Sequence, residues 1–189
     1  MPSPVGHAIA GLTTAWIADR VLRSRSDHPP VARWLPLACV VGAVVPDLDL
    51  LVSSHRTYSH SIGAATLVGL CTWLVLGIRS EGKGQKANPA RSAVAVTIAV
   101  AYFTHIVLDW LGKDSSTPPG MMALWPISAK FYLSGLDFFP EISRRYWRPS
   151  EFIVGNLQSL AWEIAILAPV AAAAWWIRKR GQTPFLRSS

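Results

Sequence analysis

Charged side chains are scarce in this sequence. Only 15% of the 189 residues are Asp, Glu, Lys or Arg, whereas 51% are hydrophobic and nine are Trp. A typical soluble domain carries about 25% charged residues. The composition therefore excludes an ordinary soluble domain, and we expect lipid to be the solvent for much of the surface.

Cysteine is also rare. Cys39 and Cys71 are the only two, and each lies inside an apolar segment. A disulfide framework or a zinc knuckle would need partner residues that the sequence does not place near them. We interpret both cysteines as packing residues.

The first segment lacks the features of a cleaved secretory signal. It reads MPSPVGHAIAGLTTAWIADRVL, with no basic lead and with a His inside the apolar stretch, whereas a signal combines a basic start with an uninterrupted apolar run. We expect it to stay in the mature protein as a helix over about residues 5–22, beginning after Ser3-Pro4. The interruptions at His7 and Asp19 favour packing inside a bundle rather than full lipid exposure.

Long apolar runs are what the sequence does have. Residues 61–78 run without a charge and would span roughly 27 Å as a helix, close to the thickness of the bilayer core. Residues 92–112 are apolar except at His105 and Asp109, and residues 157–177 carry Glu163. Both are predicted to span the membrane.

A shorter apolar run, 34–46, ends at Pro46 and is expected to form a short or partly re-entrant helix. The sequence thus predicts an all-α polytopic helical membrane bundle, a single integral membrane domain over 1–189 with four to five segments. Residues 79–91 form a basic loop. The long connection 113–156 is expected to carry short interfacial helices.

Positive charges set the expected topology. Twelve of the 18 Lys and Arg residues fall in the connections 20–33 and 79–91 and in the tail 178–187, all on one side of the predicted bundle. By the positive-inside rule this side faces the cytoplasm. We therefore expect an inner-membrane protein with a cytoplasmic C-terminus, and with the N-terminus and the connections 47–60 and 113–156 outside.

The net charge of +7 does not indicate a nucleic-acid partner. The basic residues lie in short clusters between apolar segments rather than on one helix face. Membrane lipids are the expected partners. The sequence leaves the oligomeric state open.

The predicted topology brings seven polar residues to the outer ends of their helices. His28, beside Pro29-Pro30, lies on the other side and is interpreted as an ordinary loop residue. The seven are candidate metal ligands: His7, Asp47, Asp49, His55, His60, His105 and Asp109.

Each piece of this set has a simpler explanation when taken alone. His105 and Asp109, at i and i+4, leave one helix face together, but they could equally form a hydrogen bond that satisfies two buried groups. Asp47 and Asp49 resemble a solvated helix cap. A single polar residue such as His7 is more often structural.

Together these explanations are hard to sustain, because burying so many ionisable groups near a bilayer costs several kcal/mol unless they are paired or bind metal. We predict one or two divalent ions, Zn most favoured with Mn or Mg as alternatives, and a water made nucleophilic by the metal. We place Arg56, His60 and Asp49 in the catalytic machinery. Arg56 would stabilise a developing oxyanion or phosphate.

At these residues the sequence resembles a family of bacterial and archaeal inner-membrane-associated, metal-dependent hydrolases, one group of which is described as binding the repressor LexA. The shared features extend over about two-thirds of the chain: an early helix with His7, VVPDLD at 44–49, HRTYSHS at 55–61, THIVLDW at 104–110 and PPGMMALWPIS at 118–128. The resemblance implies that Asp47, Asp49, His55, His60, His105 and Asp109 form the metal site. It also implies that LWPIS packs near that site.

Two classes of function remain open from the sequence. The first is a membrane-bound hydrolase acting on an ester or phosphoester of a lipid or another amphiphile. The second is a non-catalytic protein, structural or regulatory in a stress or DNA-damage response, whose metal site only holds the helices together.

Overall fold

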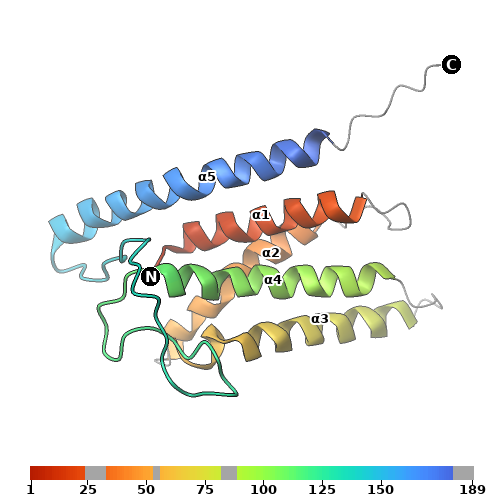
Figure 1. The fold of residues 1–189 in the computed structure, drawn as a ribbon, viewed down its shortest axis with the longest axis horizontal. Helices are drawn as coiled ribbons and strands as arrows, with labels where there is room; N and C mark the ends of the chain where they lie inside the picture. Colours follow the sequence, from red (N-terminus) through yellow and green to blue (C-terminus); the bar gives the residue numbers. More distant parts are fainter. Residues whose placement is uncertain (24–32, 53–55, 82–88, 181–189) are drawn as a thin grey trace.

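The computed structural model describes residues 1–23, 33–52, 56–81 and 89–180 of the chain. Within this part, five α-helices run back and forth along the long axis of the molecule (Figure 1). They are α1 (Pro4–Arg23), α2 (Leu35–Val44), α3 (Ile62–Glu81), α4 (Pro89–Leu111) and α5 (Asn156–Arg180). Two short 3-10 helices, η1 (Val45–Val52) and η2 (Tyr58–His60), lie between α2 and α3.

Three helices are long and apolar enough to cross a membrane: Ile62–Arg79, Ala90–Leu111 and Phe152–Arg180. Helix α4 is the central one, since it packs against α1, α2 and α3 and 56% of its apolar stretch is buried, against 11% for α3 and α5. The outer helices α3 and α5 expose apolar side chains, which suits contact with lipid. The predicted helical membrane bundle is confirmed.

Helices α1 and α2 are anchored inside the bundle. Gly11 of α1 touches α2 so closely that a Cβ at this position would lie 2.5 Å from the carbonyl oxygen of Cys39. Only glycine permits that approach. Helix α2 has 10 residues, about 15 Å at the usual rise, so it cannot cross a bilayer alone. Helix α2 ends two residues before Pro46, as the sequence predicts. Cys39 in α2 and Cys71 in α3 are both free thiols, so neither forms a disulfide.

Helix α5 is attached to both ends of α1. The carboxylate of Glu163, which is fully buried, accepts a hydrogen bond from the Ser3 backbone N–H at 2.8 Å and another from the Ser3 hydroxyl. At the other end, Asp19 accepts bonds from Arg23 at 2.8 Å and from Arg178 at 2.5 Å. These contacts explain why α1 carries polar residues yet lies inside the bundle.

The long connection does not contain the interfacial helices that the sequence led us to expect. Residues 113–148 are irregular, with the isolated bridges Gly112–Phe139 and Met121–Tyr132. Residues 149–150 and the π-helical segment Glu151–Gly155 form a short helical stretch that leads directly into α5. Carbonyl groups of this connection instead accept hydrogen bonds from the first turn of α3: Ala123 from Ile62 at 2.9 Å and Trp125 from Gly63 at 3.0 Å. Because these carbonyls satisfy otherwise unpaired helix N–H groups, an irregular backbone is favoured here.

Candidate metal centre

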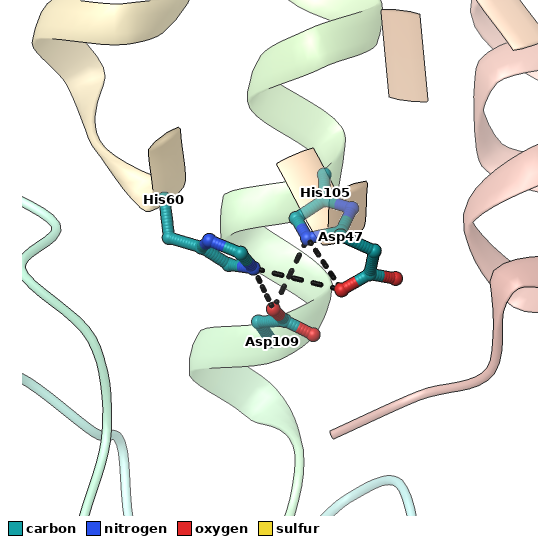
Figure 2. A group of neighbouring side chains, drawn as sticks. All are labelled: Asp47, His60, His105 and Asp109. Atoms are coloured by element: carbon teal, nitrogen blue, oxygen red, sulfur yellow. Dashed lines mark ion pairs between the residues drawn. The ribbon is translucent and has the colours of Figure 1, made fainter. Parts of the chain in front are cut away.

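Four side chains converge at one end of the bundle. Asp47 comes from η1, His60 from η2, and His105 and Asp109 from α4 (Figure 2). One potential ligand atom from each lies within 4.8 Å of all the others. Oδ2 of Asp109 is 3.2 Å from Nε2 of His105 and 3.4 Å from Nε2 of His60. Oδ1 of Asp47 is 3.7 Å from both of these nitrogens.

Local structure places each residue. His105 and Asp109 are four residues apart on α4, so they leave the same face of the helix one turn apart. His60 ends η2 and is followed by Ser61, whose Oγ accepts a bond from the Ala64 N–H and caps α3. Asp47 follows Pro46, where α2 has given way to η1.

The two histidine rings are held by bonds on their far sides. Nδ1 of His105 lies 2.7 Å from the Ala43 carbonyl oxygen. A carbonyl can only accept, so Nδ1 carries the proton and Nε2 offers its lone pair to the cluster. Nδ1 of His60 lies 3.1 Å from Oδ2 of Asp49. Such outer contacts orient the histidine ligands of many metal sites.

The burial of the cluster fits a cation. His60, His105 and Asp109 are all 0% exposed. Within the described residues, Nε2 of His105 and both carboxylate oxygens of Asp109 make no hydrogen bond. Buried polar atoms without partners are costly. A divalent ion bound by these atoms would remove that cost, so the residues present fit a metal site.

Electrostatics outside the membrane-spanning helices support the same reading. Burial by itself would lower the pKa of His60, but the attraction of the Asp47 and Asp49 carboxylates outweighs it and raises that pKa to about 9. Burial would likewise raise the pKa of Asp47, yet the interactions with His60 and His105 hold it below its usual value. A strongly negative site of this kind attracts a cation, either a proton or a metal ion.

His7 lies beside the four residues rather than among them. Its ring stacks on that of His105 with centroids 3.8 Å apart, and its Nε2 is 3.3 Å from Oδ1 of Asp109. Asp109 therefore presents one oxygen to His7 and the other to His60 and His105.

Asp49, predicted as a ligand and a catalytic residue, is not brought into the group of four. Its Oδ2 accepts bonds from the Arg56 N–H at 3.1 Å and the Ser59 hydroxyl at 2.5 Å, besides contacting His60. His55, the remaining predicted ligand, lies outside the described residues.

Arg56 reaches the 114–120 segment. Its guanidinium pairs with Asp114 and donates to the carbonyl oxygens of Pro118 at 3.3 Å and Gly120 at 3.2 Å. Burial would raise the pKa of Asp114, but bonds from Ser116 and Gly120, together with the charge of Arg56, lower it. Sequence reasoning missed Asp114, because an acid in a polar loop is usually solvated.

The LWPIS stretch lies beside the site, as the resemblance implies. Trp125 contacts Tyr58 of η2 edge to face, with ring centroids 5.4 Å apart. Its carbonyl oxygen also accepts the Gly63 N–H near the start of α3. The stretch thus supports the segment that carries His60.

A pocket of about 670 Å³ opens beside the cluster. Asp47 belongs to both, and 17% of its side chain is exposed, whereas those of His60, His105 and Asp109 are at most 1% exposed. Asp47 is thus the solvent-facing corner of the group. The lining also includes Leu50, Arg56, Asp114, Glu141, Arg144 and Arg145. Sequence reasoning did not single out Arg144 and Arg145, because no local pattern places them near the candidate metal ligands.

Comparison with known proteins agrees with the membrane architecture. No curated protein and no solved structure matches the chain. The family described as YdjM inner membrane protein matches residues 1–182. The chain therefore belongs to the YdjM inner membrane protein family and is a membrane protein.

Proposed function

We propose that this protein is a membrane-bound, metal-dependent hydrolase that cleaves an ester or phosphoester of a lipid or another amphiphile. The observation that carries the proposal is a buried group of four nitrogen and oxygen ligand atoms with one solvent-facing corner, Asp47, at a pocket. A closed structural site needs no such pocket.

We expect zinc to be the ion. Four ligand atoms about 2.0–2.1 Å from a tetrahedral ion lie about 3.3–3.4 Å from one another. The separations of 3.2, 3.4 and 3.7 Å within the group lie close to that value. Hydrolysis would need a position on the ion that is open to water, and the solvent-facing corner at Asp47 would supply it. A zinc ion with such an open position would lower the pKa of the water to about 7 and so supply a nucleophile at neutral pH.

The residues of the chain have separate roles in this proposal. His60, His105, Asp109 and Asp47 hold the ion. Asp49 orients His60, and Arg56 stabilises negative charge that develops on the substrate at the pocket. The resemblance to the metal-dependent hydrolases described as binding LexA, carried by the same residues, supports the hydrolytic assignment.

A structural metal site is the second candidate. Four protein ligands suffice to close a tetrahedral zinc, and the four residues join η1, η2 and α4. In that case the ion would stabilise the outer end of the bundle and no water would be activated.

Metal analysis and turnover separate the two candidates. The purified wild-type protein should contain zinc and hydrolyse ester or phosphoester lipids, and His60→Ala should lose the turnover while the bundle stays folded. A structural site predicts the opposite pattern: no metal-dependent turnover on any ester, and a sharp fall of the melting temperature on His60→Ala or on chelation.

We further propose that the metal centre faces the outside of the inner membrane. The basic residues Arg20, Arg23, Arg79 and Arg178 lie near the ends of α1, α3 and α5, whereas the cluster lies at the opposite end of the bundle, where α4 ends and α3 begins (Figure 1). This separation is what the positive-inside rule produces when the basic end is cytoplasmic.

A further inference from the structure

The pocket beside Asp47 has a polar part and an apolar part, and η1 contributes one residue to each, Asp47 and Leu50. In a 3-10 helix, residues three apart lie on the same face. Asp47 and Leu50 share one face and both line the pocket. Leu48 and Leu51 share the next face and are 56% and 83% exposed. In a membrane protein an exposed leucine pair of this kind suits contact with acyl chains.

The polar part of the pocket carries both acids and arginines. Two of its acids have partners inside the protein: Asp114 is bound by Arg56 and by the Gly120 N–H, and Asp47 faces His60 and His105. Glu141 is the third acid of the lining. Arg144 and Arg145, both exposed, supply two positive charges to the same lining.

The chemistry of arginine suggests what this lining binds. A guanidinium group recognises phosphate through two parallel hydrogen bonds, and arginine is the preferred residue for such recognition. An uncharged carboxylic ester offers a guanidinium one carbonyl oxygen, whereas a phosphate offers the two charged oxygens that paired hydrogen bonds require.

We propose that the pocket binds the phosphate of a phosphorylated amphiphile, with Arg144 and Arg145 holding the phosphate and Leu50 contacting the apolar part of the molecule. The inference rests on the hydrolase function proposed above and selects phosphoesters over carboxylic esters as substrates. In the reaction, the oxygen of water bonds to phosphorus and the bond from phosphorus to the alcohol oxygen breaks. One proton of the water passes to the leaving alcohol, so the products are a phosphate and an alcohol and no oxidant or reductant is consumed.

Binding measurements test the arginines without relying on turnover. The zinc-loaded protein in detergent would be titrated calorimetrically with dihexanoyl phosphatidic acid, with glycerol 3-phosphate and with dihexanoylglycerol. Arg144→Gln/Arg145→Gln should weaken binding of the phosphatidic acid by about tenfold or more, since charge-assisted bonds to phosphate are lost. Arg148→Gln is the matched control, because it removes an exposed charge from the same segment without altering the pocket lining. Its effect should stay within about twofold.

A second variant tests the apolar part. Leu50→Asn should weaken binding of the phosphatidic acid and leave binding of glycerol 3-phosphate unchanged. If glycerol 3-phosphate binds wild type as tightly as the lipid does, the ligand is a soluble phosphoester and the amphiphile is excluded. If the double arginine variant binds phosphatidic acid like wild type, or if dihexanoylglycerol binds wild type equally well, the phosphate assignment is wrong.

The products distinguish this inference from the general hydrolase proposal. Release of phosphate from phosphatidic acid supports both. Release of hexanoate from dihexanoylglycerol without release of phosphate would leave the hydrolase standing and overturn the phosphate inference. Arginine-dependent binding without either product would support the pocket assignment and overturn the hydrolase.

Discussion

Asp49 lies behind His60: its Oδ2 is 3.1 Å from Nδ1 of the imidazole, on the opposite side of the ring from Nε2, which faces Asp47 and Asp109. The same carboxylate oxygen accepts the Ser59 hydroxyl and the Arg56 N–H. One acid therefore holds the ring and the turn that precedes it. Such a contact sets the direction and the basicity of a histidine ligand.

Replacing Asp49 should weaken metal binding without abolishing it. We expect Asp49→Ala to lower zinc affinity by about 10- to 100-fold, the usual effect of losing a partner of a metal-binding histidine. Competition with a fluorescent zinc chelator measures this. Asp49→Asn retains an acceptor for Nδ1 and should lose less. An effect of Asp49→Ala as large as that of His60→Ala would instead identify Asp49 as a direct ligand.

The raised pKa of His60 predicts opposite pH dependences for the metal-free and the metal-loaded protein. In the folded metal-free protein this pKa is about 9, above the value of about 6.5 for an exposed histidine. The contribution of protonated His60 to the free energy of unfolding is therefore fully present below about pH 6.5 and is lost as pH rises through 9. Zinc must displace the proton, so zinc affinity should rise over the same interval, by up to about tenfold per pH unit.

Thermal unfolding in detergent at pH 6, 7.5 and 9, with and without chelator, checks both directions. His60→Ala serves as the control, since it should flatten the dependence of the metal-free protein across this range. Metal-free stability that rises from pH 6.5 to 9 would contradict the assignment of the proton to His60.

Arg56 should matter for stability as well as for activity. Its guanidinium pairs with Asp114 and two carbonyl groups, with only 13% of its side chain and 5% of that of Asp114 exposed. Arg56→Ala leaves these acceptors without their donor and should lower the free energy of unfolding by about 3 kcal/mol. Arg56→Lys keeps the charge and should lose less. A loss of turnover with unchanged unfolding would mean that Arg56 acts on the substrate alone.

Replacing Gly11 should disturb both the packing of α1 against α2 and the metal centre. A Cβ there would lie 2.5 Å from Cys39 O and 2.8 Å from the Ala43 Cβ, so Gly11→Ala forces α2 away from α1 at a cost of about 1–3 kcal/mol. Because α2 leads directly into η1 and holds His105 through Ala43 O, zinc affinity should fall too. Gly155→Ala is the control, since nothing lies within 4 Å of its added Cβ. Equal melting temperatures for the two variants would exclude the close contact.

The topology can be tested with reporters. A fluorescent or phosphatase reporter fused after Ser189 should behave as cytoplasmic, because α5 ends in Arg178, Lys179 and Arg180. A cysteine-accessibility probe placed at the exposed Ser115 should react from the outside. The reverse pattern would move the metal centre to the cytoplasmic face.

The sequence by itself determined the membrane class, the three spanning helices and part of the metal centre. The predicted runs 61–78, 92–112 and 157–177 coincide with α3, α4 and α5 to within a few residues, because length and apolar composition are local properties. The pair His105 and Asp109 could be assigned for the same reason, since helical spacing alone places both on one face.

Only the tertiary structure decided which of the remaining polar residues join the metal cluster and which contact it from outside. Asp47 and Asp49 are two residues apart and look equivalent in the sequence, but the turn of η1 directs the first to the cluster and the second to the back of His60. The pairing of Arg56 with Asp114 and the place of Arg144 and Arg145 in the pocket depend on how distant segments pack. Packing is a property of the whole chain, and no local spacing encodes it.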